Sequence, residues 1–226
     1  MSNIPDTIES IVSIEWGMFT AVNEGGPRAG CQEDRVSFDG MRKAQFLAWP
    51  DNACESYLDD LETASRDGRN LLEEKYIHMM RTTEPAQYKA LLERFTAPPE
   101  TIRLLAGEVS NLMLEQTRIL FETYPYVSGH GRPLYSAFDY SGTSVETYQL
   151  GELLTYSEKT LTALRDYIIT PGSGGAFLAR KILENTVSFL GYDSLEAAEA
   201  ATKQHIDKLG IQVTYGCCAG GECGDE

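Results

Sequence analysis

Apolar residues recur at three- and four-residue spacing over most of the chain. The first segment with this pattern, about Thr7 to Asn23, carries Ile8, Ile11, Val12, Met18, Phe19 and Val22. A period near 3.6 residues is typical of an amphipathic helix that buries one face. We therefore expect a helix here that packs against the core.

Similar patterns predict further helices over about residues 33–49, 53–66, 85–95, 100–124, 143–170 and 176–190, one around LLEEKYIHMM and a last one from Ser194. Only Ile211 to Tyr215 alternates weakly, as a strand would. The sequence thus predicts an all-α fold. We expect a single multi-helix bundle-like domain, residues 1–209, and a flexible Gly/Cys-rich tail, residues 210–226.

Glu15 interrupts the apolar face of the first helix. On a helical wheel at about 100° per residue, Glu15 falls between Ile11 and Phe19, so its carboxylate faces the interior. A buried carboxylate needs a cation, hydrogen-bond donors, a metal or a proton. Both a functional site residue and one half of a structural ion pair fit this position, and the two interpretations remain open.

Several polar residues follow Glu15 in the next loop and helix. Gly25-Gly26-Pro27 opens a loop, and the second helix, Glu33 to Trp49, comes after it. The loop supplies Arg28, Cys31 and Gln32, and the helix supplies Arg42 at the margin of its apolar face and Gln45 within that face. Arginines suit the recognition of carboxylates and phosphates, and an interior carboxylate can act as a general base. The sequence therefore predicts a polar pocket around Glu15.

The long loop from Tyr124 to Thr143 brings two more candidates. It is rich in Gly, Pro and aromatic residues and contains His130 and Arg132 in Gly-His-Gly-Arg-Pro. Flanking glycines permit close approach of a ligand, although they also suit a simple turn. Cys31 is a candidate nucleophile because a helix N-terminus lowers a thiol pKa, but Glu33 and Asp34 oppose that effect.

The predicted helix over 143–170 carries polar residues both within its apolar face and on the opposite side. We expect Glu146 in its apolar face, near enough to the helix start to accept backbone hydrogen bonds instead of serving a ligand. Tyr148, Glu152, Tyr156 and Lys159 form a polar stripe on the other side. Earlier in the chain, His78 lies opposite an apolar stripe and is expected to be exposed.

Charge and composition exclude several classes of protein. Nineteen Lys and Arg against 34 Asp and Glu give a net charge of -15, which repels nucleic acid and anionic membranes. The chain has no apolar run near the ~20 residues that a membrane span requires. The N-terminal sequence MSNIPDTIES has no signal-peptide pattern, so we expect a cytoplasmic protein without nucleic-acid or membrane partners.

Three of the five cysteines, Cys217, Cys218 and Cys223, crowd the C-terminus. Neighbouring thiolates can bind Zn(II), Cu(I) or mercury, and Cys-Cys-Ala-Gly looks like the C-terminal tail of mercuric reductases. A di-iron centre is not favoured, because the chain has no Glu-x-x-His pair. A soft metal ion is therefore a candidate partner of the tail.

Seven pieces of sequence together resemble one bacterial family. They are EWxMF, GGxRAxCQxD, MRKxQFLAW, GRNLLxEKY, GHGRP, SVETYxxGELxTYSEKTL and ENTVxxxGYxSLEAA, and they span about Ile8 to Ala201. The family is the domain of unknown function numbered 4125. The resemblance implies one bacterial domain and brings neither an activity nor a cofactor, and the Cys-rich tail lies outside it.

The sequence favours a small-molecule-binding protein, with catalysis on an anionic metabolite left open. The candidate catalytic residues are Glu15, Cys31 and His130, and the candidate ligand-binding residues are Arg28, Gln32, Arg42, Gln45, Arg132, Glu146 and Tyr156. One alternative is soft-metal or thiol-redox chemistry at the tail. Another is a helical interaction protein without catalysis, in which the buried polar groups fix the helix packing.

Overall fold

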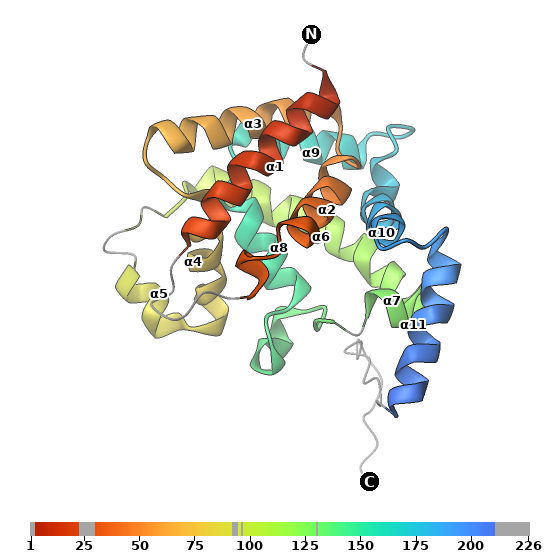
Figure 1. Ribbon diagram of the computed structural model, residues 1–226. Helices are drawn as coiled ribbons and strands as arrows, with labels where there is room; N and C mark the ends of the chain where they lie inside the picture. Colours follow the sequence, from red (N-terminus) through yellow and green to blue (C-terminus); the bar gives the residue numbers. More distant parts are fainter. Residues whose placement is uncertain (1–2, 23–29, 92–94, 96, 130, 211–226) are drawn as a thin grey trace.

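The computed structural model describes residues 3–22, 30–91, 95, 97–129 and 131–210. These residues form 11 α-helices and three short 3-10 helices, with no strand among them (Figure 1). The predicted all-α fold is confirmed. The tail beyond Gly210 lies outside the described residues, so the division into a domain of residues 1–209 and a flexible tail stays a prediction.

The α-helices are α1 (Ile4–Ala21), α2 (Arg35–Phe46), α3 (Asp51–Arg66), α4 (Leu71–Thr83), α5 (Pro85–Leu91), α6 (Glu100–Thr123), α7 (Pro125–Ser128), α8 (Val145–Leu153), α9 (Glu158–Ile169), α10 (Leu178–Phe189) and α11 (Leu195–Leu209). The short helices are η1 (Gly30–Gln32), η2 (Ser136–Ser141) and η3 (Gly175–Phe177). Side chains cap several N-termini. Asn70, for example, accepts from Leu72 N and Glu73 N at the start of α4.

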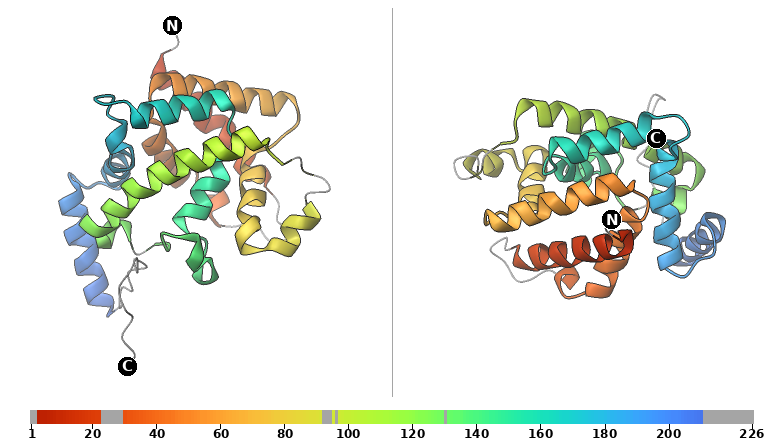
Figure 2. Two further views of the ribbon diagram at one scale, coloured as in Figure 1. Left: turned by 180° about the vertical axis from the view of Figure 1, so that it is seen from behind. Right: turned by 90° about the horizontal axis from the view of Figure 1, so that it is seen from above.

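Four helices lie side by side in one layer in the order α1, α3, α9, α6 (Figure 2). The main core lies under this layer and includes Ile11, Tyr57, Leu61, Leu161 and Leu164, all almost completely buried. Burial of such side chains is the dominant favourable contribution to folding. The layer therefore holds α1 and α3 in a fixed register against each other.

Helices α4 and α8 pack against each other beneath this layer (Figure 1). Gly151 permits their close approach, because a Cβ atom there would lie 2.8 Å from Met79 Cγ and 3.0 Å from Lys75 O. Carbon atoms cannot normally come so close. The absence of a side chain at Gly151 thus lets α8 approach the turn of α4 that carries Lys75.

Helix α10 packs against α2 and α6 at one side of the molecule, and α11 packs against α7. A second apolar cluster joins them and includes Leu120, Val187 and Leu195. The side of α6 that faces α10 is thus covered, and a space remains between α2, α6, α8 and α10, which is described below.

One predicted helix is in fact two. The segment expected as a continuous helix over 143–170 divides into α8 and α9, and Ser157 caps the second by accepting from Thr160 N. Tyr156 lies in the link between them. The break changes the helical phase, so residues of α8 do not share one face with those of α9.

A separate finding concerns membranes. Within the described ranges, no helix is long and apolar enough to cross a bilayer.

Candidate functional site

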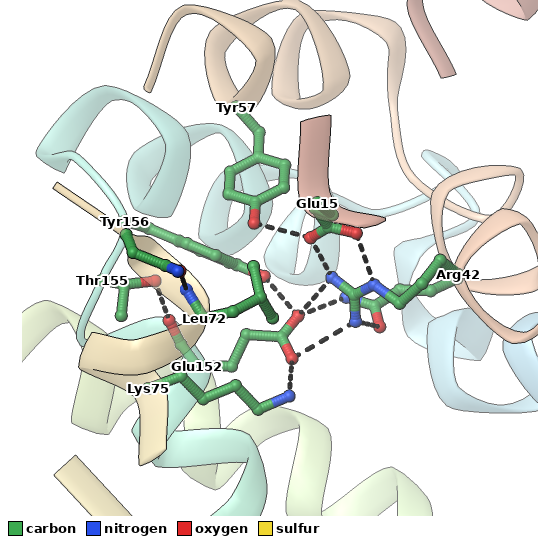
Figure 3. A network of polar contacts seen from close by, with 10 residues as sticks. Glu15, Arg42, Tyr57, Leu72, Lys75, Glu152, Thr155 and Tyr156 are labelled. Carbon is green, nitrogen blue, oxygen red and sulfur yellow. Dashed lines mark hydrogen bonds and ion pairs between the residues drawn. The ribbon is translucent and has the colours of Figure 1, made fainter. Parts of the chain in front are cut away.

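Seven polar side chains from five helices and one link meet in the interior (Figure 3). They are Glu15 of α1, Arg42 and Gln45 of α2, Tyr57 of α3, Lys75 of α4, Glu152 of α8, and Tyr156 of the link that follows α8. We call this set the charge cluster.

Glu15 is completely buried and is held by two partners. Arg42 binds it through two parallel hydrogen bonds, from Nε to Oε2 at 2.7 Å and from Nη2 to Oε1 at 2.5 Å. The Tyr57 hydroxyl donates to Oε1 at 2.7 Å. This bidentate arrangement is the strongest geometry for an arginine and a carboxylate. The predicted interior position of Glu15 is confirmed, and its partner is a cation on the next helix.

Glu152 is the second carboxylate of the charge cluster, and four residues donate to it. The distances are 3.0 Å from Arg42 Nη2, 2.7 Å from Lys75 Nζ, 2.6 Å from Tyr156 OH and 3.0 Å from Gln45 Nε2. Arg42 Nη1 adds a longer bond of 3.3 Å. A carboxylate has about four lone-pair sites, so Glu152 has no free acceptor capacity.

Burial and charge fix the protonation states in the cluster. Burial disfavours ionised Glu152, but Arg42 and Lys75 outweigh this effect and hold the pKa of Glu152 well below its usual range. Burial also opposes the charge of Arg42, yet Glu15 and Glu152 raise the pKa of Arg42 well above normal. Burial and the nearby carboxylates raise the pKa values of Tyr57 and Tyr156 well above theirs.

The cluster contains two carboxylates and two cations, so its charges balance. A buried charge without a partner is very costly, whereas a paired and hydrogen-bonded one is tolerated. A general base must be able to take up a proton near the working pH, and the Glu152 carboxylate is held ionised and fully occupied. The geometry of the cluster is thus that of a structural ion network.

A cavity of about 410 Å³ adjoins the charge cluster, and we call it the central cavity. It lies between α2, α6, α8 and α10. Its lining is mainly apolar and includes Met41, Trp49, Met113, Leu120, Ile182 and Leu183. Gln45, Glu152 and Tyr156 form the part of its wall that it shares with the cluster. Small-molecule sites commonly combine such an apolar lining with a few placed polar groups.

Arg132 and Tyr148 also line the central cavity. Arg132 is exposed, donates from Nη1 to Thr143 O at 2.9 Å, and its Cζ lies 4.9 Å from the centre of the Tyr148 ring. Lys75 Nζ lies 3.6 Å from the centre of the same ring. Arg132 forms no ion pair with any carboxylate in the described part of the chain. Its charge is therefore available to a ligand in the cavity.

The predicted site residues separate into several places. Arg42, Gln45 and Tyr156 join Glu15 in the charge cluster, and Arg132 lines the central cavity. The remaining described candidates lie elsewhere, because Gln32 Nε2 donates to Phe19 O and Val22 O, Glu146 Oε2 accepts from Ser136 N, and Cys31 is exposed on η1. Gln32 thus donates to backbone carbonyls at the C-terminal end of α1, and Glu146 binds the backbone of the loop before α8.

Five candidates cannot be placed. Arg28, His130, Cys217, Cys218 and Cys223 lie outside the described residues. Within the ranges that are described, no group of three or more His, Cys, Asp or Glu side chains is arranged to hold a metal ion.

Two predictions about burial were wrong. Glu152 belongs to the polar stripe predicted opposite the apolar face, but it is buried, because α8 ends at Leu153 and packs against α4. His78 was expected to be exposed, yet only 5% of its surface is accessible, because Phe95 covers the ring. The sequence offered one signal for Lys75, which was missed. It lies one turn from Leu71 and Leu72, on the side of α4 that is buried.

The chain matches a known protein family. A family model with the description "Protein of unknown function (DUF4125)" matches residues 5–200. No curated protein and no solved structure matches the chain.

Proposed function

We propose that this chain, which belongs to the family of unknown function DUF4125, binds a small amphipathic acid in its central cavity. The observation that carries the proposal is the position of Arg132, a cation without a carboxylate partner among the described residues, beside a mainly apolar cavity. The apolar body of the ligand would occupy the cavity. Its acidic group would accept hydrogen bonds from the guanidinium of Arg132.

The size and polarity of the cavity support this ligand class. Its volume of about 410 Å³ falls in the range of roughly 300 to 1,000 Å³ that is typical of small-molecule sites. At the wall shared with the charge cluster, Glu152 is saturated with donors. An acidic group there would meet a carboxylate, whereas at Arg132 it meets a cation. The acidic group is therefore expected beside Arg132.

The proposal is one of binding and not of catalysis. The displaced pKa values in the charge cluster all favour the protonation state that the group ordinarily has near neutral pH. Glu152 stays ionised, and Tyr57 and Tyr156 stay protonated. Such groups neither take up nor release a proton readily. The role of the cluster is to fix α2 and α8, which carry much of the cavity wall.

The test compares decanoic acid with decanol, which share an apolar chain and differ in charge. Trp49 lines the cavity and is one of two tryptophans, so Trp16→Phe leaves Trp49 as the single fluorescent reporter of binding. In this background we expect Arg132→Met to weaken decanoic acid binding about 10-fold or more, since a charge-assisted hydrogen bond contributes roughly 1.5–3 kcal/mol. Decanol affinity should remain unchanged.

Two further variants make the result specific. Arg103→Met removes another exposed arginine that donates to a backbone carbonyl, far from the cavity, and should leave both affinities unchanged. Thr117→Phe places a ring in the cavity and should weaken both ligands. If neither ligand binds, or if Thr117→Phe has no effect, the binding proposal is wrong and the alternative of an interaction protein gains support. Native mass spectrometry of the purified protein would reveal a retained natural ligand.

A further inference from the structure

A second cavity lies on the other side of Tyr156. Its volume is about 670 Å³, and we call it the His78 cavity. Helices α3 and α4, Phe95, residues 97–99 and the link between α8 and α9 line it. Its lining is much more polar than that of the central cavity. Tyr156 lines both cavities, so one residue of the charge cluster separates them.

His78 lines this cavity, and its ring has no hydrogen-bond partner among the described residues. Only 5% of its surface is accessible, and the Phe95 ring lies edge-on to it at 5.0 Å between ring centres. Both ring nitrogens keep some accessible surface, since neither is among the fully buried atoms of the described residues that have no partner. Burial, together with nearby Arg81, lowers the pKa of His78 to about 4, and the ring is neutral at pH 7. A neutral imidazole offers one nitrogen lone pair as an acceptor.

The charged lining of the cavity is predominantly acidic. Asp59, Asp60 and Glu74 contribute three carboxylates, and Arg69 contributes one guanidinium, which pairs with Glu74 at 2.6 Å. Asp60 Oδ2 accepts from Ser157 N and Thr160 Oγ1, which leaves Oδ1 without a partner among the described residues. Asp59 pairs with Lys159 at 3.3 Å, so the acidic group of the lining without a cation partner among the described residues is Asp60, and its carboxylate favours a cation in the cavity.

We propose that the His78 cavity binds an aliphatic ammonium group, as in a linear diamine. The ammonium group would donate hydrogen bonds to the imidazole of His78 and to Asp60 Oδ1, and the Phe95 and Tyr156 rings would contact the methylene chain. A metal ion fits less well, because no three metal-ligating side chains come together in the described part of the chain. This site is independent of the amphipathic acid proposed for the central cavity.

The experiment measures cadaverine binding to the full chain by calorimetry at pH 7, with pentanediol as the uncharged probe of similar length. We expect cadaverine to bind and pentanediol not to bind. His78→Phe should weaken cadaverine at least 10-fold, and His78→Gln should restore part of the affinity because its amide oxygen is an acceptor. His205→Gln, on the exposed face of α11, is the matched control and should change nothing.

A charge variant tests the site without altering His78. Thr63→Lys adds a cation at the exposed edge of the His78 cavity, while Asn52→Lys adds the same charge on α3 away from it. Only Thr63→Lys should weaken cadaverine. Equal binding by the wild type and both His78 variants, or equal effects of the two lysines, would overturn the proposal. Thr117→Phe in the central cavity should leave cadaverine binding intact, so failure here and failure of the acid-binding proposal are distinguishable.

Discussion

Lys75 and His78 lie three residues apart on α4, and both are almost completely buried, but their surroundings differ in kind. Lys75 meets Glu152 at 2.7 Å and the Tyr148 ring at 3.6 Å, as part of a network in which the charges balance. His78 lies edge-on to Phe95 and beside a cavity, and its ring has no hydrogen-bond partner among the described residues. Burial of a polar residue therefore does not by itself indicate function. What distinguishes the two is whether the structure supplies a partner.

The charge cluster and the His78 cavity also differ in the free-energy cost of burying their polar groups. In the cluster, desolvation is offset by the hydrogen bonds and by the opposite charges. In the His78 cavity, burial keeps the imidazole neutral. The free-energy cost of burying His78 therefore appears only under acidic conditions, where the ring would otherwise be protonated. The three predictions below test this contrast, from the largest effect to the smallest.

The largest effect is expected from Glu152→Gln. The change removes the anion shared by Arg42 and Lys75 and leaves Lys75 buried without a carboxylate. Breaking a buried ion pair by removing one partner costs roughly 3 to 5 kcal/mol. Urea unfolding would measure the loss, with Glu158→Gln on the exposed start of α9 as the control. A loss below about 1 kcal/mol would show that the cluster does not stabilise the fold.

The second effect depends on pH and concerns His78. Its pKa is about 4 in the folded state and near the ordinary histidine value of 6.5 when unfolded, so the unfolded chain takes up the proton first as the pH falls. Stability is therefore lost between pH 6.5 and about 4, by roughly 3 kcal/mol at about 1.4 kcal/mol per pKa unit.

The measurement compares the wild type with His78→Gln, because other groups also titrate in this range. Urea unfolding of both proteins at several pH values gives the difference in their free energies of unfolding. As the pH falls from 6.5 to 4, the free energy of unfolding of the wild type should decrease more than that of the variant. A constant difference would mean that His78 is not held neutral by burial.

The smallest effect is expected from Tyr57→Phe. The hydroxyl donates to Glu15 Oε1, but Arg42 continues to bind both oxygens of Glu15 after its removal. We expect a loss of about 1 to 2 kcal/mol, typical of one hydrogen bond to a charged group. Tyr140→Phe, at an 84% exposed position, is the control and should lie within about 0.5 kcal/mol of the wild type. A cost for Tyr57→Phe as large as that of Glu152→Gln would contradict the ranking.

The helices and the first half of the charge cluster could be predicted from the sequence. Periodicity within one helix places Glu15 inside and Gln45 on an apolar face, because both depend only on local helical phase. The second half could not be predicted in this way. The burial of Glu152 depends on where α8 stops, and that depends on the packing of α8 against α4.

Lys75 and His78 show a second limit of the sequence pattern. A lysine within a helix is usually exposed, and the burial of Lys75 depends on Glu152, 77 positions away. The burial of His78 depends on Phe95, which approaches from a different segment. A contact between two distant segments does not change the hydrophobic periodicity of either segment. Sequence patterns therefore predict helices better than they predict sites.

The spacing of the charge cluster along the chain has a consequence for protein synthesis. Arg42 and Lys75 leave the ribosome before Glu152, and 77 positions separate Lys75 from its carboxylate. At roughly 5 to 20 residues per second, a nascent chain spends about 4 to 15 seconds with the lysine made and the carboxylate absent. During this interval Glu15 is the only carboxylate of the network that exists, and α4 cannot bury Lys75 at its native position. Until α8 is made, α4 therefore lacks the carboxylate that pairs with Lys75 in the finished protein.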